Sequence, residues 1–157
     1  MSGNTPVAEA VDASRFRIAV VAARYNGAMV DALLARVEGE LARAGVRKGR
    51  LTVTRVPGSN ELPLAARLLI GAGRPDAVVA LGVIIRGATL HFELVAEAAS
   101  RGLMDVGLAT RVPVINGVIA ADTAAQARER CSGRINRGAE FASAALSMAR
   151  LSRSLRR

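Results

Sequence analysis

The chain alternates between short stretches that are continuously apolar or alternate apolar with polar residues, and longer stretches with apolar residues at helical spacing. The short stretches are bounded by turn signals, as strands are. The predicted strands are 16–23, 51–56, 76–85 and 112–120. Since the third of these strands is apolar throughout from Ala77 to Ile85, we expect helices to cover both of its faces.

The longer stretches predict amphipathic helices between and after these strands. They span about 29–43, 64–73, 90–104, 122–131 and 137–152. Regular alternation of strand and helix predicts an α/β fold, in which a four-stranded parallel sheet forms the middle of a three-layer α/β/α sandwich.

A single domain suits a chain of 157 residues. The first 14 residues are small, polar and unpatterned, so we expect a flexible arm at 1–14 and one domain over 15–157. We find no internal repeat and no low-complexity linker.

The amino-acid composition limits the kinds of core and of functional site that the chain can build. Hydrophobic residues make up 51% of the chain and aromatic residues only 3%, so small aliphatic side chains must fill the core. A small alanine-rich subunit of this kind can bury further apolar surface against copies of itself. The only cysteine, Cys131, excludes an internal disulfide, and with a single histidine the chain cannot build a zinc site from these two residue types alone.

The formal net charge is +9 at pH 7. Part of the excess lies in the C-terminal tail, at Arg150, Arg153, Arg156 and Arg157. Cations suit a helix C-terminus, and since no aromatic-basic platform accompanies them we expect no nucleic-acid partner. No stretch reaches the roughly 18 apolar residues of a membrane span, and the first residues show no signal-peptide pattern. We therefore expect a cytoplasmic protein without a membrane partner.

In open α/β sheets, ligands bind beyond the carboxyl ends of the strands. After the third predicted strand, Gly87, Ala88 and Thr89 turn into a helix. Small residues allow close backbone approach, and free N–H groups at a helix start favour an anion such as phosphate. The alternative is an ordinary helix cap provided by Thr89.

His91 follows within the first helical turn and is the only histidine. An imidazole beside an anion site can relay protons near neutral pH. The alternative is a surface histidine without a role. Its place at a carboxyl strand end, next to the phosphate cradle, favours proton transfer.

Two other strand ends carry candidate ligands. Ser59, Asn60 and Glu61 follow the second strand and suit a polar ligand, or alternatively a helix start. Tyr25 follows the first strand, where its ring can stack on a heterocycle or simply pack. Further along, one of four arginines is a candidate for closing on the phosphate, unless all lie on a solvated helix face: Arg128, Arg130, Arg134 and Arg137.

These residues carry a resemblance to the lumazine synthase (6,7-dimethyl-8-ribityllumazine synthase) family. The matching segments, in order, are "ARYN", "VPGSNELP", "LGVIIRGATLHFE", "VPVINGV" and "QARERCSGRINRG". The similarity covers about 16–152, and the third segment is the most specific.

The resemblance implies a flavodoxin-like fold and the penultimate step of riboflavin biosynthesis. That reaction condenses 5-amino-6-(D-ribitylamino)uracil with 3,4-dihydroxy-2-butanone 4-phosphate, releases phosphate and water, and needs no metal or organic cofactor. By position, His91 is implied as the proton-transfer residue. Gly87, Ala88 and Thr89 are implied on the phosphate side, with Arg130 pairing with the phosphate. The implied pyrimidine and ribityl contacts are Tyr25, Ser59, Asn60, Glu61, Val83, Ile84, Ile85 and Asn116.

The chain departs from the family pattern in three places. Tyr25 replaces a phenylalanine or tryptophan, which preserves stacking. Asn60 and Asn116 stand where many members carry an aromatic or large apolar residue, which changes the pocket shape. The stretch "CSGRINRG" is shorter than in members that form icosahedral shells.

The resemblance also implies homo-oligomers built from rings of five, with active sites between neighbouring subunits. The shorter stretch and the basic tail favour a free pentamer over a shell. The alternatives are a non-catalytic flavin or lumazine binder on the same fold, and an interaction protein, either a structural shell or a basic nucleic-acid binder.

Overall fold

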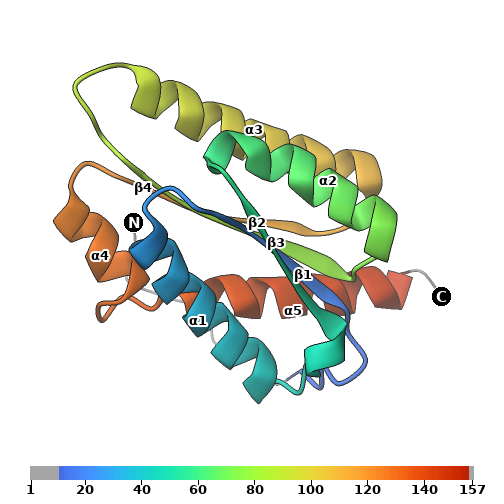
Figure 1. Ribbon diagram of the computed structural model, residues 1–157. Coiled ribbons are helices and arrows are strands. Elements are labelled where there is room, and N and C mark those ends of the chain that lie inside the picture. The colour runs from blue at the N-terminus through green and yellow to red at the C-terminus, as the bar shows by residue number, and fades with distance from the viewer. Residues whose placement is uncertain (1–10, 156–157) are drawn as a thin grey trace.

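In the computed structural model, which describes residues 11–155, helices cover both faces of a four-stranded parallel sheet (Figure 1). The strands are β1 (Ile18–Ala23), β2 (Leu51–Val56), β3 (Ala77–Ile85) and β4 (Val114–Ala121). Their order is β2-β1-β3-β4. The predicted three-layer fold is confirmed.

Five α-helices connect and cover the strands. They are α1 (Gly27–Arg43), α2 (Leu62–Gly73), α3 (His91–Thr110), α4 (Ala124–Cys131) and α5 (Arg137–Leu155). Figure 1 shows α2 and α3 on one face of the sheet and α1, α4 and α5 on the other. All five predicted helices are present, but α3 continues past Met104 to Thr110 because the buried stripe of Ala99, Leu103 and Val106 extends along it.

Two apolar clusters lie on the two faces of the sheet. The larger joins β1 and β3 to α1 and α5, with Val20, Leu33 and Ala145 fully buried. The smaller joins the opposite face to α2 and α3, with Leu62 and Leu103 fully buried. Small residues on α5 let that helix lie close to the sheet. β3 contributes to both clusters, so helices cover it on both faces, as its continuous apolar sequence predicted.

The parallel register of the sheet places the carboxyl ends of β1, β2 and β3 next to one another. β1 pairs with β2 from Ile18–Leu51 to Ala23–Val56, and with β3 from Ile18–Ala77 onward. The turns after β1, β2 and β3 therefore meet at one edge of the sheet.

The predicted N-terminal arm falls only partly within the described residues. Residues 1–10 lie outside them. Of the remainder, Ala13 is buried, and its N–H donates to the Ala44 carbonyl oxygen at 2.9 Å.

Candidate active site

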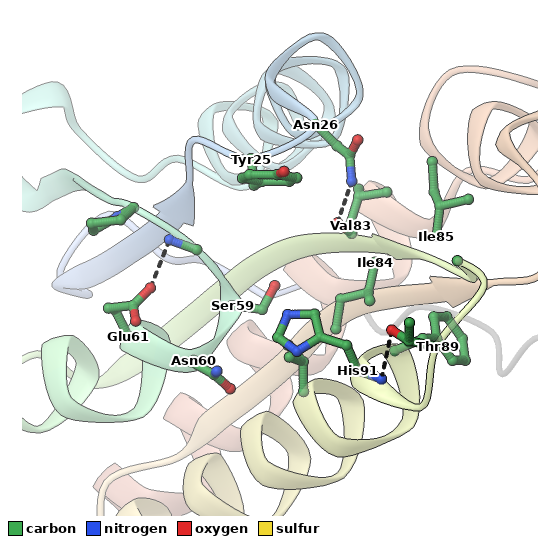
Figure 2. A pocket seen from close by; sticks show the side chains of 15 residues that line it. Tyr25, Asn26, Ser59, Asn60, Glu61, Val83, Ile84, Ile85, Thr89 and His91 are labelled. Carbon is green, nitrogen blue, oxygen red and sulfur yellow. Dashed lines mark hydrogen bonds between the residues drawn. The ribbon is translucent and has the colours of Figure 1, made fainter.

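A cavity of about 440 Å³ opens at the carboxyl edge of the sheet (Figure 2). The turns after β1 and β2, the end of β3 and the start of α3 surround it. It is lined by every site residue that the family resemblance implied except Ala88, Asn116 and Arg130. The three other candidate arginines do not line it either: Arg128, Arg134 and Arg137. Segments far apart in the chain thus form one pocket.

Tyr25 forms one wall of this cavity, and its side chain is 77% exposed. Its N–H donates to the Pro57 carbonyl oxygen at 3.2 Å, which ties the turn after β1 to the turn after β2. In Figure 2 the Tyr25 ring and the His91 imidazole lie on opposite sides of the cavity. The tyrosine ring therefore offers a broad apolar face to a flat ligand.

Asn26 is a pocket residue that the sequence analysis did not single out. It adopts a left-handed backbone conformation, with φ 55°, and its side-chain amide donates to the Val83 carbonyl oxygen at 2.8 Å. Asparagine tolerates this conformation better than most residues. The bond holds the turn after β1 against β3. Its sequence signal is an asparagine–glycine pair in the turn that follows a strand.

We expect Asn26→Gly to lower the free energy of unfolding by about 1 kcal/mol, because the hydrogen bond to Val83 is lost while the left-handed backbone is still allowed. Asn26→Ala should cost about 1–2 kcal/mol more, because alanine also strains that backbone. Chemical denaturation of both variants measures the difference. Equal losses would show that the backbone conformation does not matter here.

Ser59, Asn60 and Glu61 form a short 3₁₀ turn at the second strand end. Ser59 is buried, and a Cβ atom added to Gly82 of β3 would lie only 2.5 Å from its hydroxyl oxygen. The glycine therefore makes room for Ser59 at the floor of the pocket. Glu61 accepts the Gly58 N–H at 2.8 Å, so its carboxylate stabilises the turn in addition to lining the cavity.

The turn after β3 is open to solvent. Gly87, Ala88 and Thr89 are exposed, and within the described residues no protein group accepts their N–H groups. A Cβ added to Gly87 would meet no atom within 4 Å. The Thr89 hydroxyl accepts the His91 N–H at 3.4 Å, a weak cap. This turn leaves both donors and space for an anion.

Ala88, Asn116 and Arg130 do not line the cavity of a single chain. Asn116 lies on β4, where its amide donates to the Ser100 hydroxyl at 2.9 Å and its side-chain oxygen accepts the Val118 N–H at 3.0 Å. Arg130 lies on α4 and donates to the Gln126 carbonyl oxygen at 2.9 Å. Ala88 is on the turn after β3, between the lining residues Gly87 and Thr89.

Across residues 11–155, no three His, Cys, Asp or Glu side chains gather as a metal site would require. Over the same range, no helix combines the length and the apolar character needed to cross a membrane.

The fold and the pocket together define a flavodoxin-like α/β protein with a cavity at the carboxyl edge of its sheet, where ligands bind in open α/β sheets. The family model described as 6,7-dimethyl-8-ribityllumazine synthase matches residues 15–153. The chain belongs to the 6,7-dimethyl-8-ribityllumazine synthase family, as the resemblance of its motifs predicted.

Relatives carrying that name come from distant organisms. The chain is 45% identical to the 6,7-dimethyl-8-ribityllumazine synthase of Aquifex aeolicus, over 92% of this chain and 94% of the relative. It is 47% identical to that of Kineococcus radiotolerans, over 93% and 91%. It is 45% identical to that of Thermococcus onnurineus, over 88% and 90%. The similarity therefore extends through the whole described domain.

Proposed function

We propose that this protein is a transferase that condenses 5-amino-6-(D-ribitylamino)uracil with 3,4-dihydroxy-2-butanone 4-phosphate. The product is 6,7-dimethyl-8-ribityllumazine, with phosphate and water released, and the reaction is the penultimate step of riboflavin biosynthesis. Membership of the family supports the reaction. The observation that carries the assignment to this pocket is that one cavity places an aromatic ring, a histidine and an open turn with free N–H groups around the same space.

In the proposed chemistry, the free amine of the pyrimidine attacks the ketone and forms an imine with loss of water. Phosphate is then eliminated, the enol tautomerises to a ketone, and the ribitylamine nitrogen attacks that carbonyl carbon and closes the ring with loss of a second water. His91 moves protons to and from the reacting carbons and the leaving phosphate. The N–H groups of Gly87, Ala88 and Thr89 bind that phosphate. Holding amine and ketone together supplies much of the remaining acceleration.

We assign the pyrimidine to the wall of the pocket that lies opposite the turn at 87–89. Tyr25 stacks on the ring, while the end of β3 and the turn after β2 contact the pyrimidine and the ribityl chain. These contacts come from Ser59, Asn60, Glu61, Val83, Ile84 and Ile85, all of which line the cavity.

Replacing Tyr25 tests the stacking. Tyr25→Phe should leave pyrimidine affinity nearly unchanged, because the ring is kept. Tyr25→Ala should weaken it by about 0.5–1.5 kcal/mol beyond the lost contact area. Titration calorimetry with the pyrimidine substrate gives both values. If phenylalanine weakens binding as much as alanine, the hydroxyl is the important group and stacking is the wrong explanation.

We further propose that the protein is a homo-oligomer with its active sites between subunits. Asn116 and Arg130 lie outside the cavity of their own chain, so a neighbouring subunit supplies them. The apolar outer surface of α2 and α3 supports burial against another copy. Its large exposed side chains are Leu64, Leu68, Leu94, Met104 and Leu108.

A free pentamer is the proposed assembly, since the stretch between α4 and α5 is short. Light scattering on the purified protein should give about five times the mass of the 16.3 kDa chain. Hollow particles of uniform size in electron micrographs would contradict the pentamer and leave the reaction untouched. The cytoplasm is the proposed compartment, and cell fractionation tests it.

The reaction itself is tested by mixing the purified protein with both substrates. We expect the absorbance and fluorescence of the lumazine to rise together with release of one phosphate per product. Either substrate alone should give no signal. Tight binding of the lumazine without any turnover would instead support a binding protein on the same fold.

A further inference from the structure

Arg86 lies between the end of β3 and the turn at 87–89. It contacts both the neighbouring strand β4 and the helix α3. Its N–H donates to the Ala121 carbonyl oxygen at 2.9 Å, continuing the pairing of β3 with β4. Its Nε donates to the Asp122 carboxylate at 2.7 Å, just beyond the end of β4. The same guanidinium pairs through Nη1 with Glu93, in the first turn of α3.

The guanidinium is also positioned by an aromatic ring. Its central carbon lies 4.5 Å from the centroid of Phe92, the residue between His91 and Glu93. The hydrogen bonds to Asp122 and then to Glu93 raise the pKa of Arg86. The pKa of Glu93 is lowered, first by its own backbone N–H and then by Arg86. Arg86 and Glu93 therefore both stay charged at neutral pH.

The segment enclosed by these contacts is otherwise weakly held. Between Arg86 and the start of α3, residues 87–90 are exposed. Within this turn, the Thr89 hydroxyl accepts only a long hydrogen bond, 3.4 Å from the His91 N–H. The Arg86–Glu93 pair closes the turn into a loop, and the Arg86–Asp122 pair fixes that loop to the neighbouring strand end.

We propose that Arg86 is a positioning residue for the reaction. By joining Glu93 to Asp122, its guanidinium sets the location of the 87–89 turn and of His91 relative to the carboxyl edge of the sheet. This inference rests on the proposed function of the pocket. It assigns Arg86 no contact with substrate: the arginine acts through the turn and through the histidine that follows it.

The first test separates binding of the two substrates. Arg86→Gln should lower kcat and raise KM for the butanone phosphate, with a combined loss in kcat/KM of roughly 10- to 100-fold from misplacement of the turn. The KM for the pyrimidine should change by less than about twofold, because Tyr25 and the β2 turn are not attached to Arg86. Arg86→Lys should recover only part of the loss, because an ammonium lacks the guanidinium fork.

Arg101→Gln is the matched control. Arg101 pairs with Glu97 at 3.0 Å, also on α3, and both side chains are exposed. This variant removes an arginine–glutamate pair from the same helix at a distance from the turn, so both KM values and kcat should match wild type. Thermal unfolding of both variants should stay within a few degrees of wild type.

The second test uses the single histidine. Because the chain contains one histidine, labelling at its imidazole carbons gives one signal that belongs to His91. We expect Arg86→Gln to shift or split this signal at fixed pH, and to weaken the further shift caused by inorganic phosphate. Arg101→Gln should reproduce the wild-type signal.

The outcomes distinguish this inference from the proposed function. An inactive wild-type protein would refute the function, while the imidazole signal would still report on Arg86. With an active wild type, equal behaviour of Arg86→Gln and Arg101→Gln would overturn the positioning role. If Arg86→Gln does not fold, Asp122→Asn removes one of the two ion pairs. Unfolding of that variant as well would make Arg86 a structural residue and overturn the inference.

Discussion

His91→Ala should lower turnover by roughly 10²- to 10⁴-fold, the contribution of a well-placed general acid–base group. Some activity should remain, because the pocket still holds the two substrates together. His91 is exposed at the first turn of α3 and packs in neither core cluster, so the fold should be unaffected. Steady-state kinetics at saturating concentrations of both substrates gives the value.

A thermal unfolding curve and a phosphate titration accompany this measurement. Unchanged unfolding and unchanged phosphate binding would assign the loss to proton transfer alone. Wild-type turnover in His91→Ala would remove the histidine from the mechanism.

Arg130→Ala should raise KM for the butanone phosphate by roughly 10- to 100-fold, the value of one hydrogen bond to a charged group. The KM for the pyrimidine should change little. Arg128→Ala is the control, since Arg128 is exposed on the same short helix, α4. Equal weakening of both substrates by Arg130→Ala would assign this arginine a structural role.

Mixing the two defective proteins provides a sharper test of shared sites. If His91 and Arg130 meet across a subunit boundary, refolding equal amounts of His91→Ala and Arg130→Ala together should restore roughly one quarter of the sites, because neighbours then pair at random. When the assay uses a low concentration of butanone phosphate, each variant alone should have almost no activity. If the mixture has only the mean activity of its parents, each chain builds its own site.

Much of the architecture could be predicted from local pattern. The continuous apolar stretch at 77–85 indicated a strand covered on both faces, and β3 contributes to both core clusters. Because all strands are parallel, their carboxyl ends had to share one edge, which brought Tyr25, Ser59 and His91 into one cavity. These results follow from periodicity and from the handedness of strand–helix–strand connections.

The features that could not be predicted are side-chain contacts between residues far apart in the sequence. The Asn26 amide bonds a carbonyl group 57 positions away, and Arg86 reaches an aspartate 36 positions away. Neither contact leaves a periodic pattern in the sequence around it. The end of α3 was missed for a similar reason, since its buried stripe is defined by the β4 and α2 residues it packs against.

The position of α5 affects how the chain folds during synthesis. This helix buries Ala142, Ala145 and Ala149 against the face of the sheet that α1 also covers. It follows every other described element along the chain, so the apolar face of β1 and β3 stays partly uncovered until α5 has been synthesised. Uncovered strands of this kind promote misassociation of nascent chains. Completion of this core therefore has to wait for α5, and chaperone protection matters most before that helix has been synthesised.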